Sequence, residues 1–248
     1  CDGRCPVIVR AVQITVSFLA LLFTLPLMLV VGLITWLDDF GSPVYASVRI
    51  GKGGREFTMY KLRSMRVGAE KAKVDTVSKD DARVTWVGRF IRAGKIDEFC
   101  QFFNILNGDM SIVGRRPQIP REVDRYSEAE RGLLSVKPGL TDASSIVFSD
   151  LALIMQNHVD ANLAYAQLVR PWKSRLSLFC IEKRGLAFDT AIVLLTALNF
   201  VDRSTALRAL SWLFQKYGAC DELVAIVARN AVLKPTPPPG FDHVVTKN

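Results

Sequence analysis

The apolar residues of this chain fall into one long uninterrupted run near the N-terminus and several shorter periodic segments. From residue 11 to residue 37 no side chain is charged, and the run is apolar on every side. About 20 such residues are enough for a helix to span a bilayer. A cleaved signal peptide is the competing interpretation, because Arg4 and Arg10 precede the run. The run is longer than the roughly 7–15 apolar residues of a signal peptide, however, and no small-x-small cleavage site closes it. We therefore predict a membrane helix.

Two features favour a helix that enters the membrane and returns to the same side. Pro26 lies near the middle of the run, where its missing N–H and its ring should kink a helix. Basic residues flank both ends of the run: Arg4, Arg10, Arg49, Lys52 and Arg55. Because basic flanks favour the cytoplasmic side, we predict a re-entrant helix in residues 1–40. A helix that crosses the bilayer is the alternative.

Residues 57–65 follow the turn-rich stretch 51–54 and have the composition of a strand. Alternation with period two puts Lys61 and Arg63 on one face of that strand. Two neighbouring cations could hold a diphosphate, whereas the pattern alone favours a solvated strand face.

Residues 95–107 have apolar side chains at helical spacing. The apolar positions are Ile96, Phe99, Phe103 and Leu106. Asp97, Gln101 and Asn104 then share the opposite face of the predicted helix. Acidic residues in a first helical turn usually just complement the helix dipole. The pattern by itself therefore favours a dipole-complementing role for Asp97 over a catalytic one.

A third candidate is the loop Gly114-Arg115-Arg116-Pro117. Glycine and proline mark a tight, ordered loop, and guanidinium groups suit phosphate oxygens better than lysine does. Taken alone, an Arg-Arg pair is more often a solvated part of a loop.

The composition indicates the charge of a binding partner but not its chemical class. A net charge of +8 and a pI near 9.4 favour an anionic partner, and nucleic acid, anionic lipid headgroups and nucleotide sugars all qualify. The five cysteines are scattered without a Cys-x-x-Cys pair, and only His158 and His243 could supply imidazole. A zinc site and a disulfide framework are therefore not expected.

Four sequence blocks occur in a distinctive order: residues 81–92, the segment around Asp97-Glu98, the loop 114–117 and Lys137-Pro138-Gly139-Leu140-Thr141. In this order they resemble the bacterial sugar transferases known as monotopic phosphoglycosyl transferases. The resemblance covers roughly residues 7–200. It implies an enzyme that moves a sugar 1-phosphate from a nucleoside diphosphate sugar, of the UDP type, to polyprenol phosphate, of the undecaprenyl type. Such a reaction initiates glycan or exopolysaccharide assembly.

The resemblance also implies roles for individual residues. Asp97 would attack the β-phosphorus of the donor and expel a nucleoside monophosphate, and polyprenol phosphate would then take the phosphosugar from the aspartyl intermediate. Glu98 would bind Mg²⁺ together with Asp97, or act as a base for the acceptor phosphate. Binding of phosphate and nucleotide would fall to Lys61, Arg63, Arg83, Arg115, Arg116 and Pro117.

The chain departs from the family pattern at two informative positions. The family loop usually reads Gly-Pro-Arg-Pro, so that Arg116 takes the place of the family arginine and Arg115 that of the first proline. Asp142 stands where the family often has glycine. These changes leave the sugar, the nucleotide base and the level of activity open.

The C-terminal third is less specific. The apolar run between Asp189 and Asp202 is too short to span a bilayer and predicts a buried helix, with interfacial burial as the lesser alternative. Residues 203–216 carry an apolar helical face, formed by Leu207, Leu210 and Phe214. That face fits a packed helix and an interfacial helix about equally. The Pro-rich stretch 235–240 opens a tail that we expect to be mobile.

We predict an α/β fold, mostly helical with a small sheet, that associates with membrane lipid through the re-entrant helix. Its parts are a membrane segment (1–40), a catalytic core (41–145), a helical part that is packed or interfacial (146–218) and a tail (219–248). The expected location is the bacterial inner membrane, with the catalytic part facing the cytoplasm. A homo-oligomer is left open, as is any sequence before Cys1.

Two alternatives stay open. One is a divergent relative that binds nucleotide sugar or lipid without turnover. The other is a basic membrane-anchored scaffold or nucleic-acid-binding protein. The sequence contains no familiar motif that would support nucleic-acid binding. We therefore expect no nucleic-acid partner.

Overall fold

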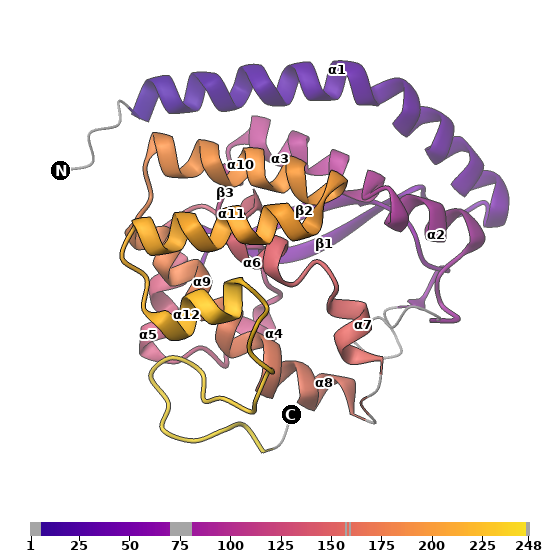
Figure 1. Ribbon diagram of the computed structural model, residues 1–248. Coiled ribbons are helices and arrows are strands. Elements are labelled where there is room, and N and C mark those ends of the chain that lie inside the picture. The colour runs from indigo at the N-terminus through magenta and orange to yellow at the C-terminus, as the bar shows by residue number, and fades with distance from the viewer. Residues whose placement is uncertain (1–5, 70–80, 157, 159, 247–248) are drawn as a thin grey trace.

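The computed structural model describes residues 6–69, 81–156, 158 and 160–246. This part of the chain is mostly helical and contains two small sheets of two strands each (Figure 1). The prediction of a mostly helical fold is therefore confirmed, although the strands form two separate pairs and not one sheet.

The long apolar run forms helix α1, Pro6–Asp39, which lies across one face of the molecule (Figure 1). Its buried side chains recur at spacings of three, four and seven and form one stripe: Ser17, Leu21, Met28, Val31 and Thr35. Only 22% of its most apolar window is buried. Within the described residues, α1 alone has the length and apolar composition to cross a bilayer. Its exposed apolar surface is compatible with membrane association.

Pro26 lies inside α1, and the helix bends in its second half (Figure 1). Proline offers no N–H to the carbonyl one turn earlier. The Thr24 hydroxyl donates to the Ala20 carbonyl at 2.7 Å, a type of bond that also promotes bending. The bend agrees with the kink predicted from Pro26, whereas the return of both ends to one side of a membrane stays a prediction.

An antiparallel hairpin follows α1. It consists of β1, Val44–Ile50, the turn η1, Lys52–Gly54, and β2, Glu56–Leu62. Helix α2, Trp86–Ala93, packs closely on the end of the hairpin, because a Cβ at Gly88 would lie only 1.9 Å from the Ser64 carbonyl oxygen. The predicted strand is confirmed in outline, but it ends at Leu62, before Arg63.

The prediction of one α-helix over residues 95–107 is wrong in its first part. Ile96–Cys100 form a 3₁₀ turn, η3, and only Gln101–Asn107 form an α-helix, α3. Lys95 precedes the turn with a φ of 51°, in the left-handed region that side chains rarely adopt. The chain thus reverses sharply before the acidic pair.

The face of α3 that was predicted to be polar is buried against β2. Asn104 is fully buried; its side chain accepts a hydrogen bond from the Tyr60 N–H at 3.1 Å and donates to the Thr58 carbonyl at 2.6 Å. These bonds satisfy the edge of β2 that β1 leaves unpaired. Phe103, predicted to face the core, is 42% exposed instead.

A second, parallel pair of strands follows α3. It is formed by β3, Ser111–Val113, and β4, Gly139–Thr141, and the segment between them holds α4, Pro120–Val123, α5, Glu128–Arg131, and the 3₁₀ helix η4, Gly132–Ser135. A Cβ at Gly139 would lie 2.1 Å from the Gly114 nitrogen, so the two strands can approach this closely only with glycine there.

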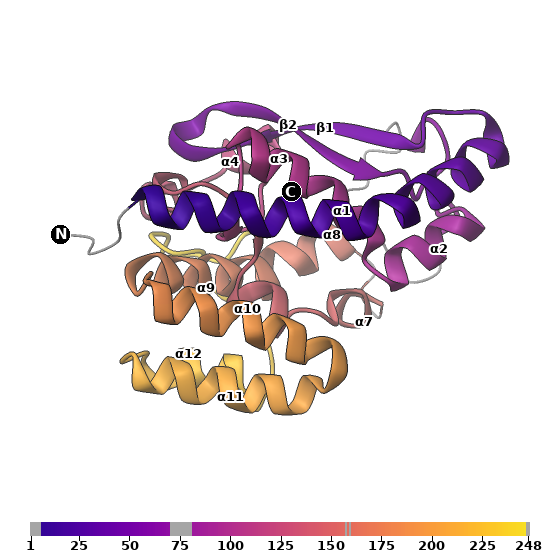
Figure 2. The same cartoon turned by 90° about the horizontal axis from the view of Figure 1, so that it is seen from above.

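The C-terminal part of the chain is helical and holds the largest apolar core. Its elements are α6, Ala143–Val147, α7, Leu151–Met155, α8, Ala161–Ala164, the π-helix η5, Tyr165–Val169, α9, Arg170–Glu182, α10, Leu186–Val201, α11, Arg203–Lys216, and α12, Asp221–Val227. Viewed from above, α1 runs between the β1–β2 hairpin on one side and α10 and α11 on the other (Figure 2).

Helices α10 and α11 differ in how far they are buried. In α10, Phe188 and Ile192 face the core, whereas Leu194, Phe200 and Val201 are exposed. The prediction of a buried helix is therefore wrong for its outer face. In α11 the predicted apolar face is packed in the core, which decides between the two interpretations of that helix.

The Pro-rich tail lies against the helices, at odds with the expected mobility. The Ser127 hydroxyl donates to the Pro239 carbonyl, and the Thr236 N–H donates to the Gln167 carbonyl at 3.0 Å. The Gln167 side chain in turn donates to the Val245 carbonyl at 2.7 Å.

Hydrogen bonds anchor both ends of α1 to the elements beneath it. Near its start, Arg10 donates to the carbonyls of Ile105 at 2.6 Å and Leu106 at 2.8 Å, at the C-terminal end of α3. At its other end, Asp39 accepts two hydrogen bonds from the guanidinium of Arg63. The hydrogen bonds from Arg63 lower the pKa of Asp39 to about 2.

Replacing Arg63 with methionine should destabilise the chain by about 2 kcal/mol, or roughly 4–8 °C in the unfolding midpoint, because Asp39 loses its partner. Thermal unfolding of the detergent-solubilised protein, followed by circular dichroism, measures this effect. Arg66→Met removes an exposed arginine and serves as the control. Equal midpoints for the two variants would contradict the anchoring role.

Candidate active site

The acidic pair lies between two cations that come from different sheets. The Nζ of Lys61, on β2, is 3.8 Å from Oδ2 of Asp97. The Nη1 of Arg116, in the loop after β3, donates to Oε1 of Glu98 at 2.8 Å. The structure thus brings together four of the residues that the sequence singled out.

The surroundings push the pKa values of the two acids in opposite directions. Burial raises the pKa of Asp97 and outweighs the attraction of Lys61. Burial also acts to raise the pKa of Glu98, but the attraction of Arg116 and Lys61 is stronger and holds that pKa below its usual value. Glu98 is therefore the more firmly ionised member of the pair.

The same surroundings also shift the pKa values of Lys61 and Arg116. Burial, followed by repulsion from Arg116, lowers the pKa of Lys61 to about 8, although Asp97 and Glu98 oppose this shift. The attraction of Glu98 raises the pKa of Arg116. Lys61 is consequently the cation of this site that loses its charge first as the pH rises.

Backbone hydrogen bonds between two of the sequence blocks fix the arginine loop. The Gly114 N–H donates to the Thr141 carbonyl, and the Gly139 N–H donates to the Arg115 carbonyl, each at 2.9 Å. Pro117 is buried directly after them. These contacts hold Arg116 in place opposite Glu98.

Three predicted phosphate ligands, Arg63, Arg83 and Arg115, have other partners in the structure. Arg63 binds Asp39 at the end of α1 and not the acidic pair. Arg83 forms an ion pair with Asp81 at 2.6 Å. The period-two argument that grouped Lys61 with Arg63 does not hold, because β2 ends between them.

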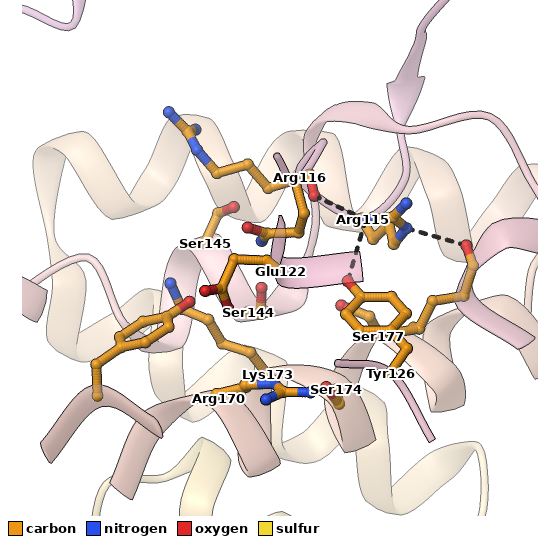
Figure 3. Close-up of a pocket in the computed structure, with 13 residues that line it drawn as sticks. Arg115, Arg116, Glu122, Tyr126, Ser144, Ser145, Arg170, Lys173, Ser174 and Ser177 are labelled. Atoms are coloured by element: carbon orange, nitrogen blue, oxygen red, sulfur yellow. Dashed lines mark hydrogen bonds between the residues drawn. The ribbon is translucent and has the colours of Figure 1, made fainter. Parts of the chain in front are cut away.

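Arg115 also points away from the acidic pair. It is buried, and its guanidinium donates to the carbonyls of Leu133 at 3.1 Å and Ile50 at 3.3 Å. Figure 3 shows it turned toward Tyr126. The extra charge of this departure from the family loop therefore holds backbone segments together inside the protein.

The other departure, Asp142, is explained by its hydrogen bonds. Its carboxylate is buried and accepts from the Ser145 N–H at 2.8 Å at the start of α6. The hydroxyls of Ser144, Ser145 and Ser177 also donate to it. Glycine could not form this cap.

A cleft lies beside the arginine loop, with about 520 Å³ of empty space including solvent at its mouth (Figure 3). We call it the Arg116 cleft. Its polar lining includes Arg116, Glu122, Ser145, Tyr165, Arg170 and Lys173. Lys173 belongs to Pro171-Trp172-Lys173, which resembles the Pro-x-Lys pattern of longer sugar transferases, and this resemblance implies no role for it.

Arg92 is a further residue that the sequence did not single out. Burial lowers the pKa of Arg92, whereas the charges of Asp97 and Asp81 act to raise it. It lies close enough to Asp97 to contribute positive potential to the acidic pair.

The acidic pair offers oxygen ligands suited to Mg²⁺. The ion pairs engage Oδ2 of Asp97 and Oε1 of Glu98, and each carboxylate has a second oxygen. Among the described residues no group of three or more His, Cys, Asp or Glu side chains gathers to hold a metal, at this pair or at any other place. Mg²⁺ commonly binds one or two carboxylates together with substrate phosphates, so this pair fits such a site.

Comparisons with known proteins find similar sequences among bacterial sugar transferases. A galactosyl transferase of Streptococcus agalactiae is 43% identical over 114 residues, covering 42% of this chain and 25% of the relative. A Bacillus subtilis protein, provisionally named undecaprenyl-phosphate N-acetylgalactosaminyl 1-phosphate transferase, is 41% identical over 117 residues, or 47% of this chain and 65% of the relative. The UDP-glucose:undecaprenyl-phosphate glucose-1-phosphate transferase of Escherichia coli is 32% identical over 203 residues, or 79% of this chain and 40% of the relative.

The chain thus spans less than two thirds of each of these relatives. The family model of the bacterial sugar transferases matches residues 5–203, which include α1, the acidic pair, the arginine loop and α10. This chain belongs to the bacterial sugar transferase family.

Proposed function

We propose that this chain transfers a sugar 1-phosphate from a nucleoside diphosphate sugar to polyprenol phosphate, through a covalent intermediate on Asp97. The observation that carries the proposal is the placement of Asp97 and Glu98 between Lys61 and Arg116 in a member of this family. Carboxylates can act as covalent nucleophiles, and cations offset the repulsion between a carboxylate and an anionic substrate.

The reaction would have two steps at one phosphorus atom. An oxygen of Asp97 attacks the β-phosphorus of the donor, and the bond from that phosphorus to the bridging oxygen breaks. The electron pair leaves on that oxygen with the nucleoside monophosphate. An oxygen of polyprenol phosphate then attacks the same phosphorus, and the carboxylate of Asp97 is released.

The pKa shifts of Asp97 and Glu98 support different roles for the two carboxylates. Burial raises the pKa of Asp97, and a poorly solvated carboxylate is a stronger nucleophile when ionised. Glu98, held ionised by Arg116, would act as a base for the acceptor or as a metal ligand. Lys61 and Arg116 would stabilise charge on the phosphoryl group in transfer.

The relatives' names support the substrates. The proteins of Escherichia coli and Klebsiella pneumoniae are named for UDP-glucose and undecaprenyl phosphate, which we propose as the types of donor and acceptor. Other relatives are named for galactose or N-acetylgalactosamine, so the sugar differs within the family. Transfer to such an acceptor would initiate assembly of a glycan or exopolysaccharide.

We further propose Mg²⁺ as the cofactor, held by Asp97 and Glu98. When bound, Mg²⁺ neutralises charge on phosphate oxygens. Both carboxylates would hold it together with phosphate oxygens of the donor.

The proposed location is the cytoplasmic face of the bacterial inner membrane. Helix α1 has exposed apolar side chains along most of its length, and α10 exposes Leu194, Phe200 and Val201. We propose that α1 enters the membrane and returns to the same side, with its bend at Pro26 inside the bilayer.

Asp97→Asn should abolish turnover, by on the order of 10³-fold or more, because an amide is a poor nucleophile of almost the same shape. Purified protein is incubated with Mg²⁺, undecaprenyl phosphate and a panel of UDP-sugars, and release of UMP is measured. Mass spectrometry of the wild type with donor alone should show a phosphosugar adduct. Asp124→Asn, an exposed acid, is the control. A fully active Asp97→Asn variant would rule out the nucleophile.

Chelation should stop transfer, and added Mg²⁺ should restore it, because the anionic substrate and two carboxylates crowd one site. The measurement is UMP release in excess EDTA and after titration with MgCl₂. An unchanged unfolding midpoint in EDTA excludes loss of the fold as the cause. Undiminished transfer in excess chelator would refute the metal role of Glu98.

The re-entrant helix predicts that both flanks of α1 face the cytoplasm. Two single-cysteine chains, one retaining Cys5 and one carrying Glu56→Cys, should both resist a membrane-impermeant thiol reagent in intact cells and react in inverted vesicles. Pro26→Leu should straighten the helix and expose Cys5 to the outside, because the apolar run is long enough to cross. Labelling of Cys5 from outside without that substitution would show an ordinary transmembrane helix.

A further inference from the structure

The Arg116 cleft contains a cation without an acidic partner. Lys173 lies on α9, and its Nζ is 5.4 Å from the ring centre of Tyr165 and 6.0 Å from that of Phe148. Among the described residues no carboxylate forms an ion pair or hydrogen bond with it. In Figure 3 its side chain extends from α9 into the same space as Glu122 and Ser144.

The other positive groups of the cleft are already engaged. Arg170 binds the fully buried Glu130 at 2.9 Å. Arg115 donates to backbone carbonyls. Asp142, the acid whose charge acts on Lys173, accepts hydrogen bonds from serine hydroxyls. Arg116 pairs with Glu98 at 2.8 Å, so the positive charge of the cleft that lacks an acidic partner is that of Lys173, beside Arg116.

The surroundings disfavour the positive charge of Lys173. Burial, followed by repulsion from Arg116, lowers the pKa of Lys173 to about 8. An anion placed between the two cations would relieve both effects, since it replaces lost solvation and screens the repulsion.

The backbone that carries Lys173 is irregular in a way that serves the cleft. Residues 161–182 form a continuous helical stretch in which the turn Tyr165–Val169 is a π-helix and the Arg170 N–H donates to the Tyr165 carbonyl. Such turns are frequent at functional sites. Tyr165 and Lys173, on either side of Pro171, both line the cleft.

The position of the cleft favours a water-soluble ligand over a lipid. Its lining is rich in hydroxyl and charged groups. The helices α4 and α9, which contribute Glu122 and Lys173, lie well below the apolar helix α1 in Figure 1. Arg116 connects the cleft to Glu98.

We propose that the Arg116 cleft binds the nucleoside diphosphate part of the donor, with Lys173 and Arg116 holding the phosphate that leaves with the nucleoside. This subsite rests on the proposed function above, in which that phosphate is the leaving group. Lys173 is a binding residue for the donor and takes no part in the second step.

Binding of UDP to the full chain in detergent, measured by isothermal titration calorimetry at pH 7, tests the subsite without turnover. Lys173→Met keeps the length of the side chain and removes its charge, and should weaken UDP binding about ten-fold. Lys173→Arg should restore binding. Lys183→Met removes the charge of a lysine that pairs with Glu182 on the same helix and should bind UDP like the wild type. Unfolding midpoints check that each variant is folded.

Steady-state transfer separates the donor from the acceptor. Lys173→Met should lower kcat/KM for the UDP-sugar about ten-fold or more and change kcat/KM for undecaprenyl phosphate less than two-fold, because the residue acts only in the first step. Unaltered UDP binding in Lys173→Met, or a rise in the acceptor KM alone, overturns the proposal. A third outcome is that the wild type binds UDP, that Lys173→Met weakens this binding, and that the wild type transfers no sugar phosphate. This outcome would support the subsite and refute the proposed function.

Discussion

Two adjacent carboxylates in a poorly solvated place are the constraint on which the rest of this structure depends. A buried carboxylate is tolerated only where cations or hydrogen-bond donors compensate its charge. For Asp97 and Glu98 the compensation comes from Lys61 on β2 and Arg116 behind β3. The hairpin, the close approach of β4 at Gly139 and the buried amide of α3 all serve to bring these two cations to one place.

The same elements connect α1 to the acidic pair. Arg10 near the start of α1 binds the last carbonyls of α3, and Asp39 at its end binds Arg63, directly after the strand that carries Lys61. A displacement of α1 at either end would therefore move α3 or the end of β2, which help to position the acidic pair and Lys61. If α1 lies in a membrane, the pair is held at a fixed depth relative to the lipid surface, which suits an acceptor whose phosphate lies at that surface.

Local patterns predicted what local geometry controls. Local patterns predicted the strand that carries Lys61 and the tight loop that carries Arg116, because both follow from short-range backbone rules. The family resemblance, and not these patterns, predicted that the two cations serve the acidic pair. Arg63 lies two residues after Lys61, but its partner is Asp39, at the end of α1. Strand periodicity carries no information on where α1 ends. The role of Asp142 could not be predicted, because a family pattern does not show which hydroxyls surround a new carboxylate. Lys173 lay in a recognised Pro-x-Lys pattern, yet only the tertiary fold places it beside Arg116.

Arg116 couples the two halves of the site because its charge acts on both. It draws down the pKa of Glu98 by attraction, and it adds to the effect of burial in drawing down the pKa of Lys173 by repulsion. An anionic phosphate in the Arg116 cleft would relieve the repulsion on Lys173 and compete with Glu98 for the guanidinium. On the proposed function, arrival of the donor would therefore loosen the hold on Glu98 at the stage when that carboxylate must serve as base or metal ligand.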